Sequence, residues 1–109
     1  MATGKETHDY ILENLARAGE VTTRRMMGEY CVYYQGKLVG DICDGRLLLK
    51  QTPTSQRLLA GCALEYPYQG AKSQMFVVEN FEDTEQMRQL LAGMYDELPT
   101  PKPKKQPRP

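Results

Sequence analysis

Two tight turns within residues 26–50 constrain the fold of this chain more than any other feature. Gln35-Gly36 and Asp44-Gly45 divide the stretch into three segments rich in apolar side chains. Asp-Gly is among the strongest hairpin signals, because glycine accepts the positive φ that a two-residue turn demands. Gln-Gly is weaker, since glutamine tolerates positive φ less well than asparagine or aspartate. The stretch predicts three antiparallel strands joined by two hairpins.

These turns also predict which residues pair and which face each side chain occupies. The first hairpin would pair Tyr34 with Lys37, Tyr33 with Leu38, Val32 with Val39 and Cys31 with Gly40. The second would pair Cys43 with Arg46, Ile42 with Leu47 and Asp41 with Leu48. Because strand side chains alternate between faces, the predicted core face carries Cys31, Tyr33, Leu38, Gly40, Ile42, Leu47 and Leu49. The other face would carry Val32, Tyr34, Val39, Asp41, Cys43, Arg46, Leu48 and Lys50.

Three apolar residues on the second face, Val32, Val39 and Leu48, would form a contiguous apolar patch. A two-layer domain leaves such a face open to water, and a contiguous apolar cluster there often marks an interface. Two interpretations weigh about equally. A loop of the same chain covers the patch, or the patch binds a partner protein or a second copy in a homodimer.

The segment before the hairpins predicts a helix and a strand. A capping box at residues 3–6 would begin a helix that runs to about Ala18 and ends at Gly19. Residues 21–27 would form the first strand, in which threonines favour extended backbone. Gly28 inside this region indicates a bulge or a close approach of backbone.

The segment after the hairpins completes the domain. A short helix over residues 54–60, with Thr54 as its cap, precedes an irregular loop over 65–72. Residues 74–79 are apolar on both faces and predict a central strand. Asp83 would cap a last helix that runs to about Leu98. Its buried stripe would consist of Met87, Leu90, Leu91, Met94 and Leu98.

The composition is that of one globular domain without an evident catalytic or metal-binding set. The 109 residues are 40% apolar and 26% charged, with no apolar run of membrane-spanning length and no secretory signal at the start. We therefore expect a cytoplasmic protein that does not contact a membrane. The three cysteines show no C-x-x-C pair, and His8 is the only histidine and is expected at an exposed or edge position. No cofactor, metal or enzymatic activity is predicted.

Charge is distributed unevenly along the chain. Residues 1–98 carry ten Lys/Arg against fourteen Asp/Glu, whereas residues 99–109 carry four basic residues, five prolines and no acid. The basic residues of this tail are Lys102, Lys104, Lys105 and Arg108. Its composition predicts a disordered, solvated segment. The tail either binds nucleic acid through phosphate contacts or only keeps the protein soluble.

Five further residues are candidates for partner binding. Arg24 and Arg25 are adjacent on a predicted strand, so they point to opposite faces, and either a structural ion pair or a partner contact explains them. Tyr66, Tyr68 and Lys72 lie in the predicted loop, where binding residues concentrate. The tyrosines either contact a ligand or cover the core with their hydroxyls in water.

The motif Arg24-Arg25-Met26-Met27-Gly28-Glu29-Tyr30, followed by the Gly36-Lys37 turn and Leu47-Leu48-Leu49-Lys50, resembles the N-terminal domain of the TfoX/Sxy family. The family pattern is R-x-M-F-G-x-Y, a hairpin with a glycine turn, and a strand ending in L-Y-L-K. Two positions depart from it: Met27 stands where phenylalanine is usual, and Cys31 where glycine is common. The resemblance covers residues 3–105.

The resemblance implies a two-layer α+β fold similar to secretion chaperones, with an antiparallel sheet of about five strands and both terminal helices on one face. Residues 1–98 would form this domain and 99–109 the tail. Members of the family are bacterial regulators linked to competence, thought to act alongside the cAMP receptor protein. Longer members carry a second domain, so this chain resembles a stand-alone N-terminal domain. We expect an interaction module in transcription, with nucleic-acid binding through the tail as the alternative and an enzyme as the third hypothesis.

Overall fold

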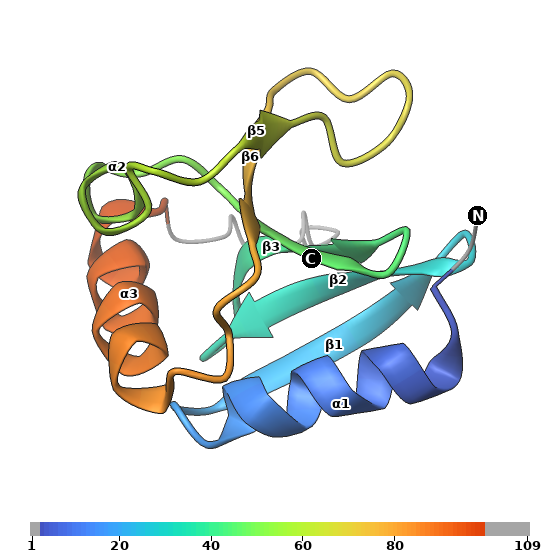
Figure 1. Cartoon of the computed structure of the whole chain (residues 1–109), viewed down its shortest axis with the longest axis horizontal. Coiled ribbons are helices and arrows are strands. Elements are labelled where there is room, and N and C mark those ends of the chain that lie inside the picture. Colours follow the sequence, from blue (N-terminus) through green and yellow to red (C-terminus); the bar gives the residue numbers. More distant parts are fainter. Residues whose placement is uncertain (1–2, 100–109) are drawn as a thin grey trace, which may run out of the picture.

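In the computed structural model, residues 3–99 are described, and they form three helices and six strands (Figure 1). In chain order these are α1 (Lys5–Ala16), β1 (Val21–Met26), β2 (Glu29–Tyr34), β3 (Lys37–Cys43), β4 (Arg46–Leu49), α2 (Pro53–Leu58), β5 (Leu64–Glu65), β6 (Met75–Val78) and α3 (Thr84–Glu97). The predicted tail, apart from Pro99, lies outside the described residues.

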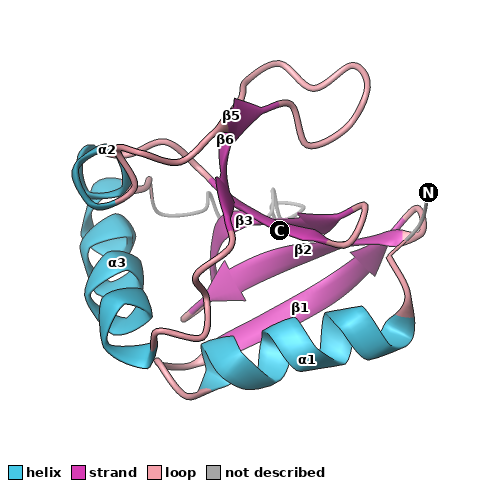
Figure 2. Ribbon diagram, in the orientation of Figure 1, coloured by secondary structure: helices cyan, strands magenta, loops and turns pink. Residues whose placement is uncertain are grey.

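The strands form one open antiparallel sheet in the order β1-β2-β3-β4-β6-β5. The helices lie on one side of it, and the loop of residues 66–74 projects from the other (Figure 2). The core lies between sheet and helices and includes Ile11 and Leu15 of α1 and Leu90 and Met94 of α3. The two-layer α+β prediction is confirmed, with six strands because β5 adds a two-residue edge.

Three two-residue turns join the first four strands. The predicted turns are confirmed, with φ of 48° and 87° at Gln35 and Gly36 and of 57° and 75° at Asp44 and Gly45. A third turn has the same pattern, since φ is 52° at Met27 and 85° at Gly28. The prediction of a bulge at Gly28 was therefore wrong, and β1 ends at Met26. Methionine gives little turn signal, which explains why the sequence pattern missed this hairpin.

A β-bulge in the first predicted hairpin changes the predicted register. Tyr34 pairs with Lys37 and Tyr33 with Leu38, as expected, but Val32 then pairs with Gly40 and Cys31 with Asp41. Val39 is the extra residue on β3. The register predicted for the second hairpin is confirmed in all three pairs. An extra residue shifts side chains between faces, because strand alternation has a period of two.

The bulge overturns part of the predicted core. Cys31, Tyr33 and Leu38 do not belong to the core under the helices, whereas Val32, Tyr34 and Val39 do. Val32 and Val39 are 0% exposed there, and Leu48 is 0% exposed in a separate cluster with Cys43 and Met75 on the opposite face. The prediction that Val32, Val39 and Leu48 form one contiguous patch on a single face was therefore wrong.

The helix caps differ from prediction where the expected capping side chain forms hydrogen bonds with a residue distant in the sequence. Gly4 is the N-cap of α1 and no side chain caps the helix, because Thr3 donates to Glu29 Oε1 from both its N–H and its hydroxyl, at 3.0 and 2.6 Å. α1 ends at Ala16, with Arg17 as its C-cap rather than Gly19. Thr52, not Thr54, caps α2. The predicted Asp83 cap of α3 is confirmed.

Two predictions for the end of the domain are confirmed. β6 lies between β4 and β5, with Phe76 and Val78 in the helix-covered core and Met75 and Val77 in the opposite cluster. The stripe of α3 is fully buried at Met87, Leu90, Leu91 and Met94, and Leu98 is half-buried.

Candidate functional site

The sheet face opposite the helices carries a groove made of two adjoining cavities. The narrower cavity measures about 350 Å³ and the wider about 770 Å³. Four residues line both: Met26, Cys31, Asp41 and Tyr68. Cavities of this size and apolar character are typical of binding sites. We call this feature the open-face groove.

Cys31 and Asp41, which form part of the groove floor, are directly opposite each other on β2 and β3. Burial raises the pKa of the Asp41 carboxyl, although the nearby Cys31 thiol and Lys50 act in the opposite direction. Burial also raises the pKa of the Cys31 thiol, and the Asp41 charge adds to that rise. The floor therefore presents a half-buried carboxylate whose neighbour is a weak hydrogen-bond donor.

Cys43 also lines the narrower cavity, two residues along β3 from Asp41. Burial, followed by the charge of Asp41, raises the pKa of this thiol to about 12. A thiol with such a pKa is protonated at neutral pH and is a poor nucleophile. Cys31 and Cys43 accordingly serve the groove as apolar surface.

Glu29 brings a second carboxylate to the narrower cavity, but its oxygens are already engaged. Oε1 accepts two hydrogen bonds from Thr3, and Oε2 accepts one from the Asp44 N–H at 3.1 Å. The Gly45 N–H in turn donates to Thr3 Oγ1 at 3.0 Å. Glu29 therefore fastens the start of the chain to the β3–β4 turn, which leaves Asp41 as the less satisfied of the two carboxylates.

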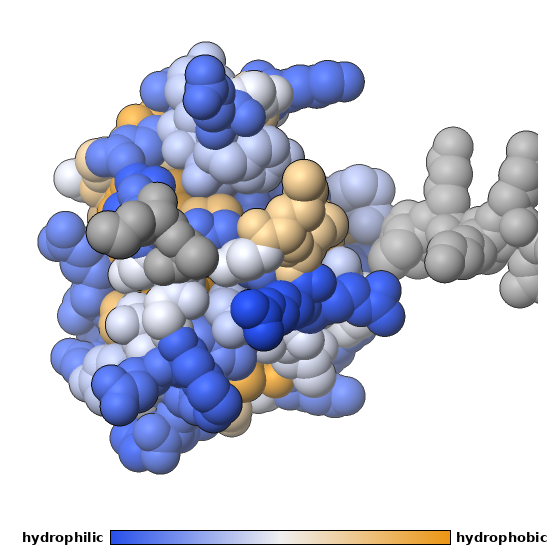
Figure 3. Space-filling model, turned by 90° about the vertical axis from the view of Figure 1, so that its right-hand side faces the viewer, coloured by the Kyte–Doolittle hydropathy of each residue, from blue (hydrophilic) through white to orange (hydrophobic). Residues whose placement is uncertain are grey.

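Large apolar side chains stand exposed at the rim of the groove. Met26 is 53% exposed, Met27 96% and Tyr68 56%. Figure 3 views the side on which the β1–β2 turn and the 66–74 loop project, and apolar surface (tan) lies there among strongly hydrophilic side chains (blue). Flexible methionines and tyrosine are typical of surfaces that adapt to a protein partner.

The structure brings together only some of the residues predicted to bind a partner. Tyr68 and Lys72 line the wider cavity, together with Lys50. Arg24 of β1 pairs with Cys31 of β2 and is exposed beside the groove. Arg25 of β1 pairs with Tyr30 of β2, whose side chain faces α1. The prediction that the two arginines point to opposite faces is thus confirmed.

The other predicted residues within the described part of the chain do not line the groove. Tyr66 is 55% exposed but does not line either cavity. Val32, Val39 and Leu48 are buried, and Lys102, Lys104, Lys105 and Arg108 lie outside the described residues. Sequence reasoning did not predict Met26 and Asp41 as binding residues. They form one surface with Tyr68 only in the folded chain, where the 66–74 loop lies beside the strands.

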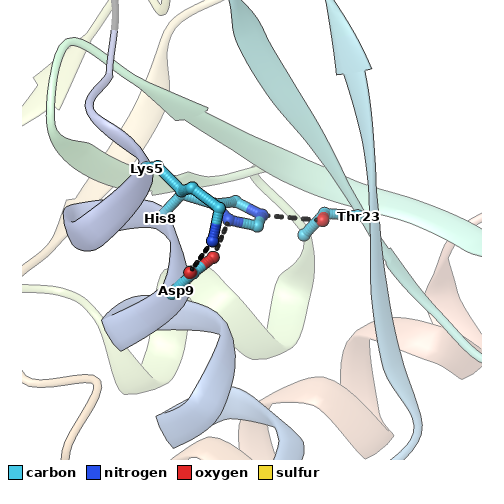
Figure 4. Close-up of polar contacts among 4 residues, drawn as sticks. All are labelled: Lys5, His8, Asp9 and Thr23. Carbon is cyan, nitrogen blue, oxygen red and sulfur yellow. Dashed lines mark hydrogen bonds and ion pairs between the residues drawn. The ribbon is translucent and has the colours of Figure 1, made fainter.

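His8 is 9% exposed, so the prediction of an exposed or edge position was wrong. Its Nε2 lies 2.8 Å from Thr23 Oγ1 and its Nδ1 lies 2.8 Å from Asp9 Oδ1 (Figure 4). The His8 ring also stacks on Tyr30, with 3.8 Å between the ring centroids. Lys5 Nζ donates to Asp9 Oδ2 at 2.7 Å. The Lys5 contact, and then His8, lower the pKa of Asp9.

This hydroxyl–imidazole–carboxylate order is also found in catalytic triads. Here it lies on the helix-covered side of the sheet, and neither His8 nor Asp9 lines the open-face groove. The sheet therefore separates the imidazole from the Cys31 and Cys43 thiols. The arrangement fastens α1 to β1 through a buried polar contact.

Within residues 3–99, no group of three or more His, Cys, Asp or Glu side chains is placed to hold a metal ion. No helix of that part of the chain has the length and apolar character needed to cross a membrane.

The chain is similar to known proteins both in its family and in an individual relative. The family model of the TfoX N-terminal domain matches residues 13–97. A protein of Spirochaeta aurantia, described as an uncharacterized 12.7 kDa protein in the trpE 5′ region, is 32% identical over 105 residues. That alignment covers 96% of this chain and 91% of the relative.

Proposed function

Because the chain belongs to the TfoX N-terminal domain family, we propose that it is a non-enzymatic protein-interaction module of bacterial transcription regulation. The single observation that carries this proposal is the open-face groove. It combines exposed Met26, Met27 and Tyr68 with the half-buried Asp41 carboxylate. Methionine and aromatic side chains are enriched in protein–protein interfaces, where polar groups at the rim add hydrogen bonds and charge contacts.

The chemistry of the groove favours binding over catalysis. A nucleophilic thiol needs a lowered pKa or an adjacent base. Burial raises the pKa of both thiols in the groove, and His8 lies on the other side of the sheet. These observations support a role as a docking surface.

The proposed partner is the cAMP receptor protein or another component of the transcription machinery, and the proposed setting is the cytoplasmic control of competence genes. The resemblance to TfoX/Sxy regulators suggests both. The groove would meet its partner through apolar contacts with Met26 and Tyr68 and through the charge of Asp41.

Two tyrosines of one loop provide a matched test. Tyr68 lines both cavities and Tyr66 lines neither, although they are 56% and 55% exposed. Binding of the full chain to purified cAMP receptor protein and to RNA polymerase would be measured for Tyr68→Glu and Tyr66→Glu. We expect Tyr68→Glu to abolish binding and Tyr66→Glu to retain it. Equal binding by both variants, or no binding by the unmodified chain, would overturn the proposal.

Nucleic-acid binding through the tail is a second candidate function, and the concentration of positive charge in residues 99–109 favours it. Phosphate contacts by basic residues release counterions, so such binding weakens steeply with salt. A duplex-DNA titration at low and high salt separates the two functions. Salt-sensitive DNA binding that is lost when the four basic tail residues become glutamine would support the alternative.

A further inference from the structure

The end of α3 is fixed to the start of β3, across the sheet from one end of the open-face groove. Lys37 is 9% exposed, and its Nζ donates to the carbonyls of Tyr95 at 2.7 Å and Leu98 at 3.1 Å. The same Nζ lies 4.0 Å from the centre of the Tyr95 ring. The next residue on β3, Leu38, lines the wider cavity on the opposite face of the sheet. The chain therefore leaves the described fold at the strand that forms the groove floor.

The groove chemistry suits a basic side chain with an aliphatic stem. Asp41 offers a half-buried carboxylate, and its pKa is raised mainly by burial, so a cation beside it would offset the cost of the buried charge. Met26 and Tyr68 provide apolar walls on which the methylene groups of lysine or arginine can pack. Tyrosine also attracts a cation through its ring face.

Residues 99–109, PTPKPKKQPRP, carry this kind of side chain repeatedly. Each lysine or arginine stands next to a proline or another basic residue, and proline-rich segments bind aromatic-lined grooves in extended form. Ten such residues span about 31 Å at about 3.1 Å per residue. The path along β3 from Leu38 to Asp41 is about 10 Å at about 3.3 Å per residue. The segment is long enough to pass the sheet end and reach Asp41.

We propose that residues 100–109 of the chain dock in its own open-face groove, with a lysine of the segment placed on Asp41. The acidic balance of residues 1–98 and the basic balance of residues 99–109 give this contact a favourable long-range field.

Three cations restrict where the segment lies. Lys50 and Lys72 line the wider cavity, and Arg24 is exposed beside Cys31. We therefore expect prolines against Leu38 and Tyr68 in the wider cavity, and a basic side chain at the Asp41 end.

This docking would regulate partner binding. That consequence rests on the proposed function, whereas the docking itself does not. A partner that binds the groove would have to displace the segment. If the segment occupies the groove nine-tenths of the time, it weakens partner binding about tenfold.

Amide chemical shifts of the full ¹⁵N-labelled chain test the docking directly. Three variants are compared with the unmodified chain: one with Lys102, Lys104, Lys105 and Arg108 changed to glutamine, Asp41→Asn, and both together. Asp96→Asn, which removes an exposed carboxylate from α3, is the control. Neutralising the segment in the unmodified chain should change the amide chemical shifts of Cys31, Asp41 and Tyr68. Neutralising it in the Asp41→Asn chain should change those shifts little.

Two results would overturn the proposal: groove amides that do not respond to neutralisation, or shifts that change with protein concentration, since these indicate a second copy as the acceptor. A separate binding measurement tests the regulatory consequence. The variant with the neutralised segment should bind purified cAMP receptor protein about tenfold more tightly than the unmodified chain. Groove shifts without any partner binding would leave the docking standing and remove the proposed function.

Discussion

Cys31 on β2 and Asp41 on β3 face each other directly, one residue out of the register that the hairpin turn alone would give. The bulge at Val39 produces this pairing. It keeps Val39 in the helix-covered core while Asp41 lies on the opposite face. The same bulge thus completes the core and places a carboxylate in the open-face groove.

Asp41→Asn should stabilise the protein at neutral pH when the four basic residues of the tail are changed to glutamine, because no lysine of the segment then offsets the Asp41 charge. Burial raises the pKa of this carboxyl above its ordinary 3.8, so the folded state holds the proton more tightly than the unfolded state. Stability is therefore lost as pH rises from about 4 through the folded pKa. In that background, thermal unfolding should show a higher Tm for Asp41→Asn at pH 7 and a smaller difference at pH 3. Asp96→Asn is the exposed control, and a lower Tm for Asp41→Asn at pH 7 would contradict the expectation.

Cys43 should resist alkylation in the folded protein. Its pKa of about 12, against the ordinary 9.0, leaves about a thousandfold less thiolate at pH 8. Mass spectrometry after timed iodoacetamide treatment should show slow labelling of Cys43 in buffer and rapid labelling in urea. Cys62, half-buried and outside the groove, is the internal comparison. Rapid native labelling of Cys43 would show that the groove floor opens readily.

His8→Ala should destabilise the fold, because it leaves the Thr23 hydroxyl without its imidazole partner and removes the stack on Tyr30. Loss of a buried hydrogen-bond partner costs about 1–3 kcal/mol. Urea denaturation measures this loss, and a double-mutant cycle with Thr23→Val isolates the hydroxyl–imidazole part. Additive effects of the two substitutions would show that the contact contributes nothing.

Gly40→Ala should be among the most damaging glycine substitutions. A Cβ at this position would collide with the Leu48 carbonyl oxygen, which belongs to the backbone of the paired strand and cannot move aside. Overpacking a core usually costs about 1–3 kcal/mol and sometimes more. Gly61→Ala is the control, because a Cβ there meets nothing within 4 Å. Urea midpoints should fall sharply for Gly40→Ala and little for Gly61→Ala.

The sequence by itself determined the elements whose signals are local. Asp44-Gly45 specified a turn, because few residue pairs adopt positive φ at both positions. The Asp83 side chain accepts from the Gln86 N–H only three residues away, so its cap was predictable. Alternation within Met75–Val78 assigned its two faces correctly, because no bulge interrupts that strand.

Only the tertiary structure decided the features that depend on distant partners. Thr3 left its expected capping role because the Glu29 carboxylate, 26 residues away, accepts its hydrogen bonds. The bulge places Val39, one residue before Gly40, in the helix-covered core, and Tyr68 reaches the groove through the path of its loop. Local preferences fix backbone angles over a few residues, whereas the face on which Asp41 lies depends on how whole strands pack.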